Sequence, residues 1–282
     1  MNRNIETFIG CYGAYADAQI ALFGAPYDST TSHRPGARFA SKAMRYESSA
    51  LETYSPYQNK DLEDTTVFDA GDLALPAGSP EPALNSVENF VKRLLQDNKL
   101  PLMIGGEHLL SLGMARALLK KYDNLHVIHF DAHADLRQEF MGQFLSHATV
   151  MRRIWELTGD GRIYQFGIRS GTKEEFAFAS LHTCMRKFNF GGLKDVVVLL
   201  KDKPIYFSLD LDILDPSVLP GTGAPEAGGV SFEELLQAVY DMRGLNLVGM
   251  DINELNPMND HSGVSTLVAC KILREAILLF DR

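Results

Sequence analysis

Short apolar runs alternate along the chain with longer stretches in which apolar residues have helical spacing. Runs rich in β-branched and aromatic residues predict buried strands at 19–24, 66–69, 101–104, 126–130, 162–167, 181–185, 205–209 and 246–251. Apolar residues recurring every three or four positions predict helices at 37–51, 81–97, 109–121, 148–157, 173–179, 232–242 and 264–279. Because alternating strands and helices form parallel sheets covered on both faces, we expect a three-layer α/β/α sandwich with a mainly parallel sheet of about eight strands.

The length of the chain agrees with a single α/β domain, which we expect to span residues 1–282. The most loop-like stretches, at 54–65 and 75–83, are short, and no repeat or low-complexity tract divides the sequence. No run reaches the roughly 18 apolar residues that a membrane-spanning helix needs. The first residues also lack the apolar core of an export signal.

Cysteine usage and net charge bear on the cellular compartment of the protein and on its possible partners. Cys11, Cys184 and Cys270 are odd in number and widely spaced, which argues against a disulfide framework and favours a reducing compartment. We therefore expect a cytoplasmic protein. A formal net charge of −9 argues against a nucleic-acid-binding surface, and it permits a small cationic substrate without identifying one.

Possible metal ligands follow three of the predicted strands, in the segments L-P-L-M-I-G-G-E-H, L-H-V-I-H-F-D-A-H-A-D and P-I-Y-F-S-L-D-L-D. The candidates are His108, Asp131, His133, Asp135, Asp210 and Asp212. The carboxyl ends of parallel strands meet at one edge of a sheet, and alternate residues of an extended chain point to the same side. We therefore expect these side chains to converge on one place.

A cluster of four aspartates needs cations, because packed carboxylates repel one another and raise one another's pKa values. Two divalent ions would cancel this charge. Carboxylates and imidazoles without a thiolate favour manganese over a structural zinc site. An isolated D-x-H or D-x-D is usually a solvated turn or a helix cap, but three such segments at strand ends favour a shared metal centre.

Two more segments lie at element ends facing the same edge: S-H-A-T at 146–149 and D-I-N-E-L-N-P at 251–257. Glu254 would follow a fourth strand, on the same side of the sheet as the metal ligands. Alone, Glu254 is as readily a surface glutamate, and His147 is more often a helix-capping or surface histidine. Glu107 is interpreted as a helix cap or a support for the ligands.

Taken in order, the segments resemble the ureohydrolases, the manganese family of arginase and agmatinase. They are G-G-E-H, D-A-H-A-D, S-H-A-T, S-L-D-L-D-I-L-D-P-S-V-L-P-G-T-G-A-P-E-A-G-G and D-I-N-E-L-N-P. The resemblance begins at G-A-P-Y-D-S-T-T-S-H-R-P-G-A-R-F (24–39), which is similar to the opening strand and loop of agmatinases, and it runs into the final predicted helix. It implies an arginase-like sandwich around an eight-stranded parallel sheet, in agreement with the strand count above.

The resemblance also implies two Mn²⁺ per subunit and a role for each matching residue. The implied ligands are His108 and Asp135 for one ion, His133 and Asp212 for the other, and Asp131 and Asp210 as bridges. A hydroxide bridging the two ions would attack the guanidinium carbon of the substrate. His147 would shuttle a proton to the departing nitrogen, and Glu254 would hold the guanidinium through paired hydrogen bonds.

Within this family, the segment at 136–146 indicates the substrate. Arginases carry an asparagine- and serine-rich stretch there, whereas this chain reads L-R-Q-E-F-M-G-Q-F-L-S, which looks like an agmatinase. Glu139 would favour the ammonium end of agmatine, while Arg137 would favour an acidic substrate, and both are candidate substrate contacts. We expect hydrolysis of agmatine to urea and putrescine, with arginine, guanidinobutyrate and formiminoglutamate as alternative substrates of the same metal centre.

A catalytically idle relative that binds another protein is the alternative class. Such a relative typically loses metal ligands or the proton shuttle, and this chain keeps all of them. By resemblance we expect a homo-oligomer, either a trimer or a hexamer. The remaining histidines have no assigned role; they are His33, His126, His129, His182 and His261.

Overall fold

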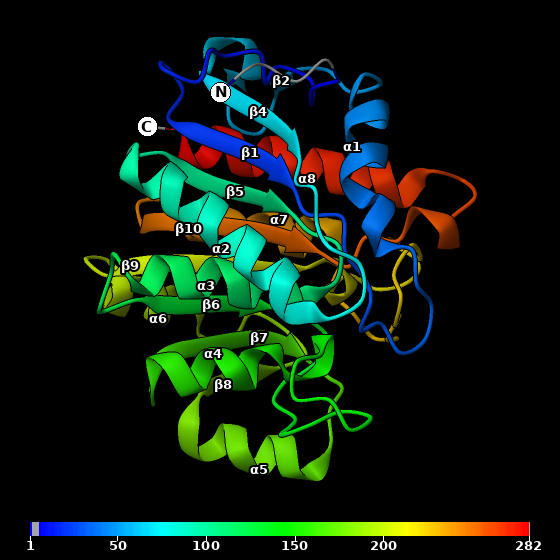
Figure 1. Ribbon diagram of the computed structural model, residues 1–282. Coiled ribbons are helices and arrows are strands. Elements are labelled where there is room, and N and C mark those ends of the chain that lie inside the picture. The colour runs from blue at the N-terminus through cyan, green and yellow to red at the C-terminus, as the bar shows by residue number, and fades with distance from the viewer. Residues whose placement is uncertain (2–5, 282) are drawn as a thin grey trace.

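An eight-stranded parallel sheet runs through the middle of the molecule (Figure 1). The computed structural model describes residue 1 and residues 6–281, so residues 2–5 and 282 of the expected domain lie outside the described part. The strand order is β4-β1-β5-β10-β9-β6-β7-β8, with parallel pairing throughout. The strands are β1 (Ile20–Gly24), β4 (Val67–Asp72), β5 (Leu100–Ile104), β6 (His126–Phe130), β7 (Ile163–Ile168), β8 (Cys184–Lys187), β9 (Pro204–Asp210) and β10 (Asn246–Asn253).

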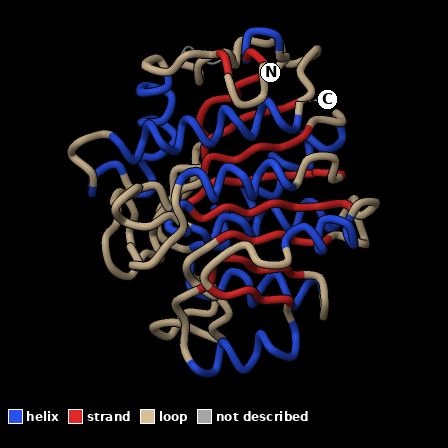
Figure 2. The backbone as a smooth tube through the Cα atoms, turned by 180° about the vertical axis from the view of Figure 1, so that it is seen from behind, coloured by secondary structure: helices blue, strands red, loops and turns tan. Residues whose placement is uncertain are grey.

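Helices cover both faces of this sheet, as Figures 1 and 2 show from opposite sides. One face carries α2 (Pro80–Gln96), α3 (Ser111–Leu119), α4 (Val150–Thr158) and α5 (Lys173–His182). The other face carries α1 (Ala40–Ser48), α6 (Leu193–Leu200), α7 (Phe232–Asp241) and α8 (Val264–Phe280). Each helix layer buries its own hydrophobic cluster against the sheet. The predicted three-layer sandwich is confirmed.

Short elements connect these layers. A small antiparallel pair forms between β2 (Tyr54–Ser55) and β3 (Lys60–Asp61). The 3-10 helices are η1 (Ala37–Phe39), η2 (Leu62–Asp64), η3 (His108–Leu110), η4 (His147–Thr149), η5 (Leu211–Ile213) and η6 (Pro257–Asn259). Three of them, η3, η4 and η5, directly follow or contain candidate site residues.

The predicted boundaries fail mainly around β8 and α6. The strand predicted at 181–185 begins only at Cys184, because α5 continues to His182 and leaves Leu181 77% exposed on its last turn. Leu193–Leu200 forms a helix that apolar spacing did not predict, since its run V-V-V-L-L is apolar on every side. Val198 and Leu199 of this helix are exposed. An unbroken short apolar run does not separate strand from helix.

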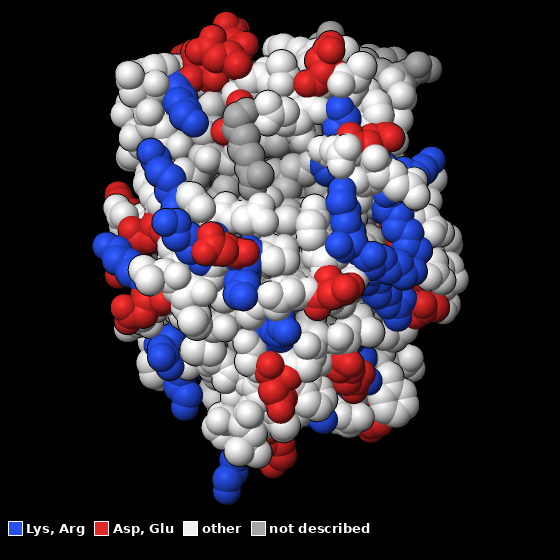
Figure 3. Space-filling model, turned by 90° about the vertical axis from the view of Figure 1, so that its left-hand side faces the viewer, with Lys and Arg blue, Asp and Glu red and all other residues white. Residues whose placement is uncertain are grey.

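The strands that carry the candidate site are adjacent at the centre of the sheet, in the order β5-β10-β9-β6. Their carboxyl ends point toward the loops on the right of Figure 1, while both labelled termini lie on the left. Figure 3 views the left-hand side, where Lys and Arg are interspersed with Asp and Glu. Among the described residues, no helix has the length and apolar character needed to cross a membrane.

Candidate metal centre and active-site cavity

Asp131, His133 and Asp135 converge through a tight turn rather than through the extended strand that their spacing predicted. β6 ends at Phe130, and Asp135 adopts a left-handed φ of 53°. The Asp131 carboxylate accepts a hydrogen bond from His133 N at 2.5 Å. An aspartate commonly stabilises a turn in this way, by accepting from the N–H two residues ahead. The three candidate residues therefore lie close together, but through a turn and not through the extended geometry that the spacing argument assumed.

β9 ends in the same kind of turn. Asp210 is its last residue, and the Asp210 carboxylate accepts a hydrogen bond from Asp212 N at 2.8 Å as η5 begins. Ala132 N donates to Asp212 Oδ1 at 3.2 Å, which ties the turn after β6 to the turn after β9. The two turns thus hold their carboxylates against one another.

His108, in η3 just beyond β5, brings a third strand end into the cluster. Its Nδ1 lies close to one oxygen of each of three carboxylates: Asp131 Oδ2 at 3.1 Å, Asp135 Oδ2 at 3.2 Å and Asp210 Oδ2 at 3.2 Å. This nitrogen is buried and has no hydrogen-bond partner. A buried nitrogen that lies within ion-pair distance of three carboxylate oxygens, without a hydrogen bond to any of them, is suited to a metal ion.

The other ring nitrogen of His108, Nε2, forms a hydrogen bond with Ser208. His108 Nε2 lies 2.9 Å from Ser208 Oγ, which in turn donates to Asp251 Oδ1 at 2.8 Å. Because the serine proton is committed to Asp251, Ser208 accepts from His108 Nε2–H. The hydrogen-bond network therefore assigns the free lone pair to Nδ1, on the side of the carboxylates.

His133 occupies the opposite side of the cluster. Its Nδ1 lies 2.9 Å from Asp212 Oδ2 and 3.6 Å from Asp131 Oδ1. Asp131 therefore presents one oxygen toward His133 and the other toward His108. The geometry has two halves, with His108 in one and His133 in the other, and Asp131 lies between them.

Burial and mutual repulsion dominate the electrostatics of these carboxylates. Burial, with the charge of Asp131, raises the pKa of Asp135 to about 6. Burial, with the charges of Asp212 and Asp131, raises the pKa of Asp210 well above its ordinary value. Burial also acts to raise the pKa of Asp131, but neighbouring imidazoles, His129 first, hold it well below its usual range. In the described part of the chain, these aspartates pair only with imidazoles.

These residues fit divalent metal ions. Two groups bring their ligand atoms within 4.8 Å of one another: His108, His129 and Asp131, and Asp131, His133 and Asp212. Carboxylate and imidazole donors without thiolate suit a hard or borderline ion. Cations would also offset the repulsion that burial makes costly.

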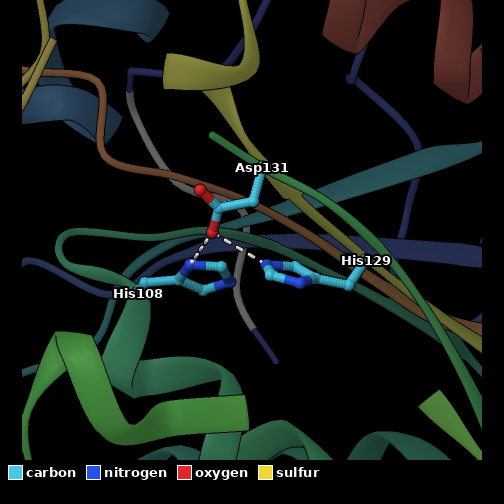
Figure 4. A group of neighbouring side chains, drawn as sticks. All are labelled: His108, His129 and Asp131. Carbon is cyan, nitrogen blue, oxygen red and sulfur yellow. Dashed lines mark hydrogen bonds and ion pairs between the residues drawn. The ribbon is translucent and has the colours of Figure 1, made fainter. Parts of the chain in front are cut away.

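His129 is a neighbour of the cluster that the sequence reasoning left unassigned. Figure 4 shows His108 and His129 aimed at the same oxygen of Asp131, and His129 Nε2 lies 2.8 Å from it. Gln165 Nε2 donates to Ala134 O at 2.8 Å and faces His129 Nδ1 at 3.1 Å, so Nδ1 accepts and Nε2 carries the proton. His129 thus donates to Asp131. Its position two residues before Asp131 was the available sequence signal.

A cavity of about 230 Å³ opens over the cluster. Five of the six candidate ligands line it, together with His147, Glu254 and Arg137. Asp131, the remaining candidate, is completely buried beneath the others. The candidate ligands and the two predicted catalytic side chains therefore share one cavity at the carboxyl edge of the sheet.

Glu254 is fixed in the cavity wall just beyond β10. It adopts a φ of 65°, which is uncommon for a bulky residue, and its Oε1 accepts a hydrogen bond from His108 N at 2.7 Å. Burial raises the pKa of Glu254 to about 8, although the hydrogen bond from His108 lowers it. The carboxylate is thus anchored through one oxygen and gains from a nearby positive charge.

His147 is the first residue of η4. Its ring lies between two hydroxyls, with Nδ1 3.3 Å from Ser146 Oγ and Nε2 3.3 Å from Ser32 Oγ. Burial lowers the pKa of His147 to about 4, below the value near 6.5 that an exposed imidazole would have. Burial therefore favours the neutral form of the ring.

The two predicted substrate contacts lie in different surroundings. Arg137 lines the cavity, where its Nε lies 3.5 Å from Glu175 Oε2 and its guanidinium 4.7 Å from the centre of the Phe140 ring. Glu139 is exposed and is not part of the lining. Glu175 also lines the cavity, so it is Glu175 that shares this wall with Arg137.

Glu107 does not cap the helix that follows it, so the capping alternative was wrong. The buried carboxylate makes no capping hydrogen bond to η3. It accepts instead from Thr30 N at 2.8 Å, Thr30 Oγ1 at 2.6 Å and Thr31 Oγ1 at 3.3 Å. Burial raises the pKa of Glu107 to about 7, while the hydrogen bonds from Thr30 lower it. No sequence pattern linked these distant segments.

A three-layer sandwich with this acid and imidazole cluster at its carboxyl edge defines a class of α/β proteins built around paired metal ions. The chain belongs to the arginase family, whose family model matches residues 18–279. It is 43% identical over 281 residues to an agmatinase of Bacillus subtilis, which covers 98% of this chain and 96% of the relative.

Solved structures agree with this assignment. A protein from Clostridium difficile superimposes with a TM-score of 0.92 at 48% identity, covering 95% of this chain and 99% of the other. The agmatine ureohydrolase of Thermoplasma volcanium gives a TM-score of 0.88 at 31% identity, covering 97% and 94% respectively. The arginase-like fold predicted from the sequence is therefore confirmed.

Proposed function

We propose that this protein is an agmatinase, which hydrolyses the guanidino group of agmatine to give urea and putrescine. The observation that carries the proposal is the buried His108 Nδ1, which has no hydrogen-bond partner and faces three carboxylates at the floor of a cavity that Glu254 and His147 also line. The similarity to agmatinases over nearly the whole chain supports the choice of substrate.

The six clustered side chains would hold two Mn²⁺ ions. The proposed ligands are His108 and Asp135 for one ion, His133 and Asp212 for the other, and Asp131 and Asp210 for both. When bound, the ions would neutralise the acid cluster and make the attacking water nucleophilic near neutral pH. Asp131 suits the shared position because each of its oxygens faces a different imidazole.

Glu254 would bind the guanidinium of the substrate. Its carboxylate is anchored by His108 N and lies in the cavity wall, so it can accept hydrogen bonds from the guanidinium N–H groups. The positive charge of the substrate would offset the burial that raises the pKa of Glu254. This contact would hold the guanidinium carbon over the floor of the cavity.

His147 would move the proton that the reaction requires. Water adds through its oxygen to the guanidinium carbon, and the bond from that carbon to the alkyl-bearing nitrogen then breaks, with its electron pair leaving on nitrogen. That nitrogen needs a proton to depart as an amine. A neutral imidazole in the cavity wall can take the proton that water releases and deliver it to this nitrogen.

The part of the cavity wall around Arg137 bears on the choice among guanidino substrates. Arg137 forms an ion pair with Glu175, and its guanidinium lies over the Phe140 ring, so this wall does not present a free cation. This pairing supports agmatine, whose far end is an ammonium. An Arg137 released from Glu175 would favour guanidinobutyrate, which makes that compound the second candidate.

Urea release by the manganese-loaded protein tests the proposal. Agmatine, arginine, guanidinobutyrate and formiminoglutamate would be compared side by side, with formamide also monitored for the last. We expect the highest kcat/KM on agmatine. A preference for another compound would overturn the substrate and leave the metal chemistry in place, while no turnover on any of the four would overturn the enzyme proposal.

Three sequence expectations join this proposal. We infer that residues 1–282 form one domain, that the chain forms a homo-oligomer of three or six copies, and that it resides in the cytoplasm. Cys11, Cys184 and Cys270 are free thiols, which supports a reducing compartment. Sedimentation analysis of the purified protein tests the number of copies.

A further inference from the structure

Glu107 is a buried carboxylate in the described part of the chain whose hydrogen-bond partners all come from one loop. Its side chain has no exposed surface, and it forms no ion pair with Lys or Arg. It receives three hydrogen bonds, two from Thr30 and one from Thr31, in the loop that follows β1. Burying a carboxylate is costly, so an acceptor with this many local donors is expected to fix the loop that supplies them.

The hydroxyl of Thr30 connects this carboxylate to the proposed proton carrier. Thr30 Oγ1 lies 2.6 Å from Glu107 Oε1, and His147 N donates to the same Oγ1 at 3.1 Å. The Thr30 hydroxyl donates its single proton to Glu107 Oε1. The oxygen of Thr30 is then free to accept from His147 N–H, and the direction of the chain of hydrogen bonds is fixed.

The same loop also reaches the imidazole. Ser32 Oγ lies 3.3 Å from His147 Nε2, on the opposite side of the ring from Ser146 Oγ at 3.3 Å from Nδ1. The first N–H of a helix has no partner within that helix, and in η4 this N–H belongs to His147. Thr30 satisfies that orphan donor, so the loop after β1 holds both the backbone and the ring of His147.

We propose that Glu107 and Thr30 are positioning residues that hold His147 over the reacting centre. This inference rests on the proposed function, because it gives His147 the proton-transfer role. Three distant segments, at residues 30, 107 and 147, form one clamp. η4 is a single short turn, and the clamp adds a backbone hydrogen bond from a distant loop to the capping by Ser146.

Replacing the Thr30 side chain isolates the contact. Thr30→Val keeps the shape but removes the hydroxyl, so we expect kcat on the preferred substrate to fall about tenfold with little change in KM, because a displaced catalytic group slows chemistry more than binding. Thr30→Ser restores the hydroxyl and should return kcat to within about threefold of the wild type. Manganese content should be unchanged in both variants.

A matched control and a second route distinguish the clamp from general packing. Thr31→Val removes a hydroxyl from the same carboxylate but no contact to His147, and it should lower kcat less than Thr30→Val does. Glu107→Gln replaces one acceptor oxygen by an NH2 group, which donates and cannot accept, so it should lower kcat in the same direction as Thr30→Val. If Thr30→Ser is as slow as Thr30→Val, the hydroxyl is not the cause and the clamp is overturned.

A double-mutant cycle tests whether Thr30 acts through His147. In a His147→Ala background, Thr30→Val should change kcat by less than about twofold, because residues that act as a unit are not additive. The inference fails if Thr30→Val slows this background by the same factor as it slows the wild type.

Hydrogen exchange at the His147 amide keeps the clamp testable without turnover. Thr30→Val should speed this exchange by about tenfold, and Thr31→Val should leave it near the wild-type rate. Faster exchange in a protein that hydrolyses no guanidino compound would uphold the clamp and overturn the proposed function. If the wild type is active and Thr30→Val and Thr31→Val show the same exchange rate at this amide, the proposed function stands and the clamp is overturned.

Discussion

Two aspartate pairs lie on or just beyond strands of the same sheet, and they differ in which groups neutralise their charge. At the edge strand β4, Asp69 accepts from Arg45 Nε at 2.9 Å and from Arg45 Nη2 at 3.0 Å, and Asp72 accepts from Arg45 Nη1 at 2.5 Å. At the central strand β9, Asp210 and Asp212 face imidazoles and each other. Asp69 and Asp210 are both almost fully buried.

The difference shows how a structural carboxylate is distinguished from a functional one. The guanidinium of Arg45 is always charged and binds carboxylates in a fixed geometry, so Asp69 is satisfied by the fold alone. Among the described residues, the carboxylates after β9 and β6 have no arginine partner, and burial, together with repulsion from neighbouring carboxylates, raises the pKa values of Asp210 and Asp135. Their deficit of positive charge is what two metal ions and a cationic substrate would fill.

Loss of the shared carboxylate should have the largest effect. Asp131→Ala removes the group that faces both imidazoles, and we expect it to abolish binding of both ions and to lower urea release by about a thousandfold or more. Metal analysis after dialysis and a urea assay measure the two losses. Asp72→Asn, at the edge strand, is the control and should keep full manganese content. If Asp131→Ala still held two ions, the proposed ligand set would be wrong.

Loss of the proton carrier should come next and should separate binding from chemistry. His147→Ala should retain both ions and lower kcat by about 10²–10⁴-fold, the usual contribution of a general acid or base. Turnover and metal content are measured on the same preparation. His126→Gln, on the buried part of β6, should stay near the wild-type rate. A His147→Ala enzyme with normal turnover would remove the assignment.

Much of this comparison was accessible from the sequence. The run at 126–130 predicted β6 with its observed bounds, and the six candidate ligands were found because they follow apolar runs. Asp69 ends one such run and Asp72 follows shortly after it, but the partner that satisfies both, Arg45, lies on a different element. A strand-end aspartate is therefore a candidate until its partners are known.

What the sequence could not supply is contact between distant segments. The hydrogen bonds of Glu107 to Thr30 and of Ser208 to His108 join residues about 80 to 100 positions apart, and nothing in local periodicity encodes them. The turns after β6 and β9 were also missed, because a carboxylate that accepts from its own backbone leaves no periodic signal. The sequence pattern selected the candidate residues, whereas only the folded structure showed which residues they contact.

Replacing an aspartate by asparagine should lower the free energy of unfolding at β4 and raise it at the end of β9. Asp69→Asn breaks a buried pair with Arg45, and we expect the free energy of unfolding to fall by about 3 kcal/mol. Asp210→Asn in metal-free protein removes a repelled charge, and we expect a gain of about 1 kcal/mol, as is common when a functional site is neutralised. Urea unfolding in the presence of a chelator measures both. A loss at Asp210 as large as that at Asp69 would erase the distinction drawn here.

The most local expected effect is a pH dependence of stability that is confined to the metal-free site. Burial and Asp131 raise the pKa of Asp135 from 3.8 to about 6 in the folded chain. Below the unfolded value the carboxyl is protonated in both states, and as the pH rises through the folded value the native state loses stability relative to the unfolded one. The stability of Asp135→Asn minus that of the wild type should therefore grow between pH 3.8 and about 6 and then level off. With saturating manganese, the sign of this stability difference should reverse, because the ion binds only the ionised carboxylate and so stabilises the wild type. A difference that is flat with pH in chelator would show that Asp135 is not repelled by its neighbours.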